Sequence, residues 1–173
     1  RNPLSDKKVK TSKPCSLTSE QQTAVDAVCT AVDDERYKAF LLHGVTGSGK
    51  TEVFMQSIAH VLEKGKTALV LVPEISLTPQ MVSRFLARFG ERIAVLHSGL
   101  SLGERYDEWK RIQSGGADIV IGARSAVFAP LKNIGIIIID EEHSDTYKSE
   151  MSPRYDAKEA AEFRVKQYGA VLL

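Results

Sequence analysis

A glycine-rich run ending in lysine and threonine is the first feature of this sequence with a defined chemistry. It matches the pattern G-x-x-x-x-G-K-[ST] and consists of Gly44, Val45, Thr46, Gly47, Ser48, Gly49, Lys50 and Thr51. Backbone N–H groups of such a loop wrap a phosphate chain at a helix N-terminus, and glycines let the backbone approach closely. We expect Lys50 to reach the β- and γ-phosphates and the Thr51 hydroxyl to hold Mg²⁺. A ligand-free glycine turn is the alternative, but a predicted strand precedes the run and a predicted helix follows it, as the motif requires.

An apolar run that ends in carboxylates is the second chemical feature. Four isoleucines at 136–139 lead directly into Asp140, Glu141, Glu142 and His143. The carboxyl end of such a strand lies at the sheet edge where α/β proteins bind ligands, which is also the edge of the phosphate loop. We expect Asp140 to meet Mg²⁺ directly or through water, and Glu141 to polarise the attacking water as general base.

Each part of this acidic segment has a simpler alternative. A lone acidic run is usually a solvated loop, but the isoleucine strand and the phosphate loop together favour the catalytic interpretation. For His143, hydrogen bonding to a local carbonyl and a role in coupling both stay open.

These residues need a scaffold, and alternating amphipathic and apolar segments predict one. Strands are expected at Ala39–Leu42, Thr67–Val72, Ile93–Leu96, Ile119–Ile121, Ile134–Ile139 and Ala170–Leu173. Helix starts are indicated at Thr18 with Gln21, at Thr78 before Pro79, at Ser101 with Glu104, and at Asp156 with Glu159. The pattern is typical of an α/β fold, a mostly parallel β-sheet with helices on both faces.

Composition bounds the class of protein. The chain has 173 residues, 43% of them hydrophobic and 26% charged, which fits one soluble domain, and its net charge of +1 favours no particular partner. Cys15 and Cys29 are too far apart for a metal pair, so no zinc is expected in this segment. With no membrane-length apolar run and no signal peptide, we expect no membrane partner and a cytoplasmic location. Residues 1–16, with five basic residues and two prolines, are expected to form a linker or arm before a lobe at 17–173.

The order of short motifs along the chain resembles the first motor lobe of a superfamily 2 DNA helicase. It is most similar to the primosomal replication-restart helicases, the family of primosomal protein N′. The segments that bear the resemblance are GVTGSGKTE, LVPEISLTPQ, LHSGLS, IVIGARSAVFAPL and IIIIDEEH, followed by Tyr147-Lys148 and Pro153-Arg154-Tyr155.

The resemblance implies a RecA-like P-loop NTPase domain that uses ATP and Mg²⁺. It implies a 3′-to-5′ DNA helicase that acts in replication restart at stalled or branched forks and helps reload the replicative helicase. The implied partners are single-stranded and forked DNA, primosome and helicase-loading proteins, and single-stranded DNA-binding protein, with the helicase itself a monomer.

The resemblance also assigns roles to single residues. Gln21 matches the glutamine that reads adenine, although its capping role can hold at the same time. The residues that match strand-tracking positions are Pro73, Glu74, Thr78, Gln80, Gly122, Arg124 and Ser125. Phosphate contacts of this kind bind DNA by its structure and not by its sequence. His97 and Ser98 match a position near the DNA path, with a satisfied histidine at the strand end as the alternative, and a surface salt bridge is the alternative for Arg124.

The segment after His143 matches the part of these helicases that links DNA engagement to hydrolysis through aromatic side chains stacked on bases. Tyr147 and Tyr155 are the aromatic residues it offers here. Ser149, Glu150 and Met151 stand where some relatives have more aromatic residues.

The family continues into a Ser-Ala-Thr motif and a second lobe with arginine fingers, and this chain is expected to stop just before that motif. We therefore expect a fragment that binds Mg-ATP weakly and hydrolyses it poorly. Two other interpretations differ in what the sequence must contain. A small-molecule kinase or GTPase would need a lid or an NKxD motif, which the sequence lacks, and a DNA or protein docking module without turnover stays open as the alternative.

Overall fold

The computed structural model describes residues 12–45 and 47–173 and has an α/β architecture. The helices are α1 (Ser19–Asp33), α2 (Lys50–Glu63), α3 (Pro79–Phe89), α4 (Leu102–Gln113) and α5 (Ala157–Tyr168). The strands are β1 (Lys38–Ala39), β2 (Thr67–Leu71), β3 (Ile93–Leu96), β4 (Ile119–Gly122), β5 (Ile134–Ile139) and β6 (Val171–Leu172). Short 3₁₀ helices are η1 (Glu74–Ser76), η2 (Gly90–Arg92), η3 (Arg124–Phe128) and η4 (Asp145–Tyr147).

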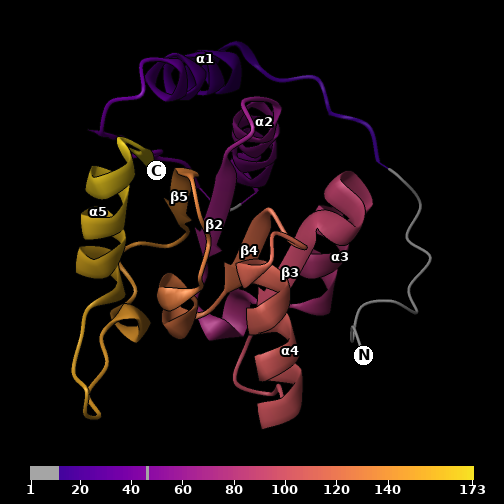
Figure 1. The fold of residues 1–173 in the computed structure, drawn as a ribbon. Helices are drawn as coiled ribbons and strands as arrows, with labels where there is room; N and C mark the ends of the chain where they lie inside the picture. Colours follow the sequence, from indigo (N-terminus) through magenta and orange to yellow (C-terminus); the bar gives the residue numbers. More distant parts are fainter. Residues whose placement is uncertain (1–11, 46) are drawn as a thin grey trace.

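All pairs of neighbouring strands in this sheet are parallel, and the strand order is β1-β6-β5-β2-β4-β3. β5 and β2 lie side by side near the middle, with Leu71 opposite Ile139. Figure 1 shows α5 at one side of the molecule and α3 at the other. The predicted parallel α/β fold is therefore confirmed.

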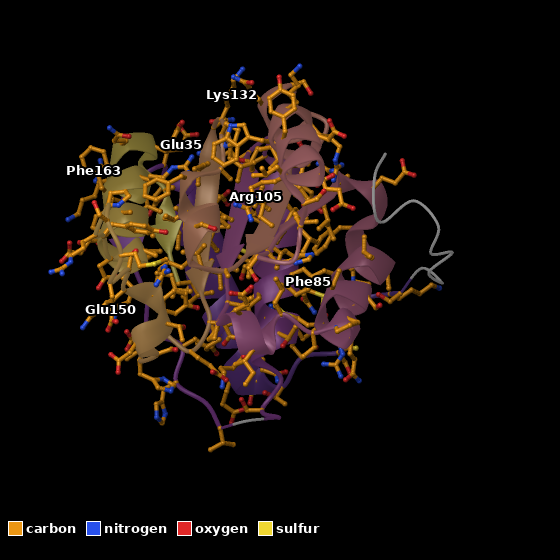
Figure 2. The ribbon with its side chains drawn as sticks, turned by 90° about the horizontal axis from the view of Figure 1, so that it is seen from below. Glu35, Phe85, Arg105, Lys132, Glu150 and Phe163 are labelled. Carbon is orange, nitrogen blue, oxygen red and sulfur yellow. The ribbon has the colours of Figure 1, made fainter. Side chains whose placement is uncertain are left out.

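Helices cover both faces of the sheet, and the two sides of each strand supply two separate cores. On one face, Val70 of β2 packs with residues of α1, α2 and α3; on the other, Leu71 packs with residues of α4, α5 and η3. Phe85 of α3 is fully buried in the first core, and Figure 2 shows it in the interior of the molecule. Strands buried on both sides explain why the sequence shows continuous apolar runs there instead of alternation.

The helices begin where the sequence indicates. At α1 the Thr18 hydroxyl accepts from the Gln21 N–H at 3.3 Å, while the Gln21 side chain accepts from the Thr18 N–H at 2.9 Å. The same reciprocal pair forms at α4 between Ser101 and Glu104. These bonds satisfy N–H groups that have no partner within the helix.

The first strand is shorter and more exposed than predicted. A buried strand was expected at Ala39–Leu42, but β1 covers only Lys38–Ala39, both residues are exposed, and Leu41 is 77% exposed. The reason is position: β1 is at the edge of the described sheet and pairs only with the two-residue strand β6. An apolar run predicts a strand from local composition, whereas burial depends on its neighbours.

Candidate nucleotide-binding site and nucleic-acid interface

The phosphate loop and the acidic motif meet at the carboxyl edge of the sheet, as predicted. The Asp140 N–H donates to the Leu71 carbonyl oxygen at 2.9 Å, which fixes the end of β5 beside the end of β2. A cavity of about 700 Å³ lies against Lys50, Thr51, Asp140 and Glu141. This volume is within the range of ligand sites in proteins, about 300–1,000 Å³.

The described loop glycines are needed for their backbone conformation or for close contact. Gly47 has φ of 83° and Gly49 has φ of 82°, in the left-handed region that glycine adopts at little cost. A Cβ atom on Gly44 would lie 2.6 Å from the Ser48 Oγ, and one on Gly49 would collide with the Gln21 amide. The predicted loop residue Thr46 lies outside the described residues.

Lys50 is the first residue of α2, and its ammonium group lies over the loop. Its Nζ donates to the carbonyl oxygen of Gly44 at 2.5 Å and to that of Val45 at 3.4 Å. Gly49 caps α2 without a side-chain hydrogen bond, so the first N–H groups of this helix are left without a side-chain acceptor. Free helix N–H groups next to an ammonium group make a strongly anion-favouring site.

Gln21 joins the start of α1 to the phosphate loop. Its Nε2 donates to the Ser48 carbonyl oxygen at 2.8 Å, while its Oε1 accepts from Thr18. The capping role is therefore confirmed, and the amide is held against the loop. Its adenine-reading role stays a prediction.

The acidic residues differ in exposure and backbone strain. Asp140 is partly buried, and this desolvation raises the pKa of its carboxyl group, with the nearby Glu141 charge adding to the effect. Glu141 is exposed and has φ of 48°, which is rare for a residue with a side chain. A desolvated carboxylate beside a threonine hydroxyl is the oxygen donor set that Mg²⁺ prefers, so these residues fit the predicted ion.

A buried ion pair that the sequence analysis missed supports the loop. Glu52 follows the phosphate loop, and its carboxylate accepts from Arg88 of α3 at 3.0 and 3.1 Å, with side chains 13% and 8% exposed. The same carboxylate accepts from the Cys15 N–H at 3.1 Å. Arg88 also donates to the Lys13 carbonyl oxygen, so this pair fastens residues 12–16, which form no helix or strand, onto α2 and α3. No sequence pattern relates two residues 36 positions apart.

A second cavity, of about 670 Å³, opens on the other side of Lys50. His143 lines it together with Glu142 and the first residues of α5. The His143 side chain is exposed, so it is free to face a ligand or another part of a larger protein. Its coupling role stays a prediction.

The first group of predicted DNA contacts clusters at the ends of β2 and β3. The Glu74 carboxylate accepts from both the hydroxyl and the N–H of Ser98, the latter at 3.1 Å. These bonds, the Ser98 hydroxyl above all, lower the pKa of Glu74, and the His97 and Arg124 charges act in the same direction. The structure therefore brings together two motifs that the resemblance named separately.

The start of α3 lies in the same region. The Thr78 hydroxyl oxygen accepts from the Met81 N–H at 3.2 Å, which caps the helix, and its hydrogen remains available to a ligand. Gln80 is exposed on the first turn. A capped, exposed helix N-terminus is compatible with the predicted phosphate contact.

Two of the residues predicted to contact DNA are buried in this structure. Pro73 is buried at the start of η1, and Gly122 is buried at the end of β4. A Cβ atom on Gly122 would lie 2.5 Å from the Leu96 carbonyl oxygen and 2.6 Å from the Ala126 Cβ. Close packing of the backbone explains the glycine at position 122. The DNA contacts of Pro73 and Gly122 stay predictions.

Arg124 links the second predicted DNA motif to the segment after the acidic cluster. Its guanidinium donates to the carbonyl oxygens of Thr146, at 3.4 Å, and Lys148, so backbone oxygens and not a carboxylate are its partners among the described residues. It also lies over the Tyr155 ring, 5.8 Å from the centroid. Ser125 beside it is exposed, as a phosphate contact requires.

An exposed aromatic residue next to this arginine was missed. Phe128 is 50% exposed and packs edge-on against Tyr155, with ring centroids 4.9 Å apart. Together with Arg124 these rings form a surface that we call the aromatic platform. Phe128 is the phenylalanine of the GARSAVFAP segment, but the sequence does not show whether its side chain is buried or exposed.

Tyr147 cannot stack on bases, so that prediction is wrong. Its side chain is fully buried beneath the sheet edge, and its hydroxyl lies 2.6 Å from the Asp140 carbonyl oxygen and 3.1 Å from that of Leu71. Burial also raises the pKa of this phenol above its ordinary value. Any coupling through Tyr147 must act on the position of the acidic motif and not through contact with DNA.

Among the described residues, no helix has the length and apolar character needed to cross a membrane.

Comparison with known proteins agrees with these motifs. The DEAD/DEAH box helicase family matches residues 18–164. The chain is 57% identical to the replication restart protein PriA of Bacillus subtilis over 97% of its length, and 51% identical to that of Synechocystis over 87%. These alignments cover only 21% and 18% of the two relatives, so the chain spans about a fifth of their length.

A solved structure of RecG bound to a three-way DNA junction shares the fold, with a TM-score of 0.63 and 23% identity over 92% of this chain and 21% of that one. The predicted resemblance to the replication-restart helicases is confirmed by the PriA matches. Because the family match extends over most of the chain, this protein belongs to the DEAD/DEAH box helicases.

Proposed function

We propose that this chain is the ATP-binding motor lobe of a 3′-to-5′ DNA helicase that acts in replication restart at stalled or branched forks. One observation supports this above the others: Lys50, Thr51, Asp140 and Glu141 surround one cavity of about 700 Å³. Their chemistry is that of phosphate binding, cation binding and water activation. The name of the PriA relatives, replication restart protein, supports the role in restart.

In this proposal each residue has one task. The loop N–H groups and Lys50 bind the terminal phosphates, and Thr51 with Asp140 holds Mg²⁺, which when bound neutralises the charge that develops on the transferred phosphate. Glu141 accepts the proton of the attacking water. Its exposed side chain leaves room for that water, while its φ of 48° fixes the backbone from which it projects.

DNA lies, in this proposal, along the carboxyl edge of the sheet. The exposed candidates are Glu74, Thr78, Gln80, Ser98 and Ser125, with partly buried His97 and Arg124 between them. Single-stranded or forked DNA is the proposed substrate, and primosome proteins, helicase-loading proteins and single-stranded DNA-binding protein are proposed partners of a monomeric, cytoplasmic helicase.

Calorimetric binding of Mg-ADP tests the nucleotide site. We expect the unaltered chain to bind and Lys50→Ala to lose binding while keeping its melting temperature. Lys132→Ala is the matched control, because this lysine is exposed and far from the loop (Figure 2). Unchanged affinity in Lys50→Ala would remove the phosphate loop from the proposal.

Glu141→Gln tests the chemical step in a longer form of the protein that contains a second lobe. The amide keeps the shape of the side chain but cannot accept a proton. We expect ATP binding to persist and turnover to fall, and normal turnover would exclude Glu141 as the general base.

A further inference from the structure

The nucleotide cavity has a wall that the helicase motifs do not include. Besides the phosphate loop, it is lined by Arg84 and Arg88 of α3, by Met55 of α2, and by Ser12, Lys13 and Cys15. Helix α3 begins at the predicted DNA contact Thr78, yet its later turns face the cavity that holds Lys50.

Arg84 brings a positive charge to this wall. Within residues 12–45 and 47–173 its guanidinium has no ion-pair or hydrogen-bond partner, although the cavity also contains the carboxylate of Glu52. That carboxylate is already engaged by Arg88. Arg84 is exposed and lines the same cavity as the phosphate loop. A guanidinium without a partner among the described residues is suited to phosphate or hydroxyl oxygens.

Arg88 supplies a second, independent indication of a ligand. Its side chain is only 8% exposed, and its Nε is buried without a hydrogen-bond partner among the described residues. A buried N–H without a partner lowers stability because it has given up its hydrogen bonds to water, so an acceptor in the cavity would remove this cost. Arg84 is one helical turn earlier, on the same face of α3.

We propose that Arg84 and Arg88 bind the α-phosphate and ribose end of the nucleotide whose terminal phosphates lie on the phosphate loop. This inference rests on the proposed ATP site. Lys50 is expected at the β- and γ-phosphates, and the cavity continues from Thr51 towards Met55 along α2. The α-phosphate and ribose of a bound nucleotide then lie between α2 and α3.

The assignment gives α3 two ligands. Its exposed N-terminus is predicted to meet a DNA phosphate, and Arg84 and Arg88 on its second and third turns meet the nucleotide. The ion pair between Arg88 and Glu52 holds this helix against the helix that follows the phosphate loop.

The test is calorimetric binding of Mg-ATP and Mg-ADP to this chain and to Arg84→Gln. We expect the affinity of Arg84→Gln to be about tenfold lower, because a hydrogen bond to a charged group is lost. The loss should be the same for Mg-ATP and Mg-ADP, because both contain the α-phosphate. Arg105→Gln is the control with the same charge change, because Arg105 is exposed on α4 and does not line the cavity. A loss confined to ATP would place Arg84 at the γ-phosphate and overturn the proposal.

Arg88→Lys is a second variant, which keeps a cation beside Glu52 but lacks the Nε donor. We expect it to fold and to bind both nucleotides more weakly. If the unaltered chain binds nucleotide and both variants bind as well as Arg105→Gln, this inference fails while the proposed function stands. If Arg84→Gln weakens only binding to single-stranded DNA, the residue belongs to the DNA path and the inference fails. If the unaltered chain binds no nucleotide, the proposed function and this inference fail together.

Discussion

The hydroxyl of Tyr147 donates to the carbonyl oxygen of Asp140, 2.6 Å away, from a fully buried ring. The Tyr147 hydroxyl oxygen also lies 3.1 Å from the Leu71 carbonyl oxygen, so this side chain bridges the ends of β5 and β2. The residue that begins the acidic motif is thus positioned from below by the core.

Tyr147→Phe should therefore lower stability without emptying the core. The ring still fills its site, but the Asp140 carbonyl oxygen loses its hydroxyl donor, which we expect to cost about 1–3 kcal/mol. The Leu71 carbonyl oxygen keeps its bond from the Asp140 N–H. Urea unfolding measures the change. Tyr155→Phe is the matched control, because Tyr155 is only partly buried, and equal stability of the two variants would contradict the bridging role.

Glu52→Ala should destabilise the chain more than removal of an exposed pair. Breaking a buried ion pair leaves a charge without compensation, which costs about 3–5 kcal/mol. Glu162→Ala is the control, since the Glu162–Lys166 pair is about half exposed, with side chains 44% and 54% exposed, and exposed pairs contribute little to stability. Thermal unfolding of Glu52→Ala, of Arg88→Ala and of the double variant gives the coupling energy between the two side chains. If the two losses of stability are additive, the ion pair does not contribute to stability.

Much of the fold was predictable because its signals are local. Strands buried on both faces appear as apolar runs, and the ends of β3 and β5 agree with prediction to the residue. Capping boxes placed the starts of α1 and α4. The edge strand β1 was misjudged because its exposure depends on which strands lie beside it.

The site was predictable to the level of its motifs and not to the orientation of each side chain. Motif matching named Gly122 and Tyr147 as ligand contacts, and both are buried. It missed Phe128 and the Glu52–Arg88 pair, because exposure and long-range pairing arise only from tertiary packing.

Gly122→Ala should destabilise the chain, since the new Cβ atom has no room beside the Leu96 carbonyl and the Ala126 methyl group. Overpacking of this kind costs about 1–3 kcal/mol. Gly103→Ala should have the opposite sign, because Gly103 lies in α4 with nothing within 4 Å of its Cβ position and alanine favours helix. Denaturant midpoints decide between these signs, and destabilisation by both variants would refute the steric argument.

Glu74 should contribute stability that depends on pH. The Ser98 hydrogen bonds lower its pKa in the folded chain, so the contribution is present above the unfolded pKa, about 4.3, and is lost as pH falls through the folded pKa. Glu74→Gln should therefore lower the melting temperature at pH 7 more than at pH 3. Glu150→Gln, at an exposed loop position (Figure 2), controls for the change in net charge, and a pH-independent difference would rule out the Glu74 contribution.

The aromatic platform gives the last prediction, which rests on the proposed DNA path. Phe128 is half exposed beside Tyr155 and Arg124, so an unpaired base can stack on its ring. Phe128→Ala should weaken binding of an oligothymidine by about 1–3 kcal/mol, the range found per stacked base. Because no phosphate contact is removed, the dependence of affinity on salt concentration should keep its slope.

Phe163→Ala is the matched control, since Phe163 is 64% exposed on α5 and lies at the periphery of the molecule (Figure 2). Fluorescence anisotropy at several salt concentrations separates the two effects. If both phenylalanine variants bind equally, the platform does not contact DNA. A second outcome would also contradict stacking: Phe128→Ala changes the slope of the salt dependence but leaves the affinity at low salt unchanged. In that case the substitution has displaced Arg124 and its phosphate contact.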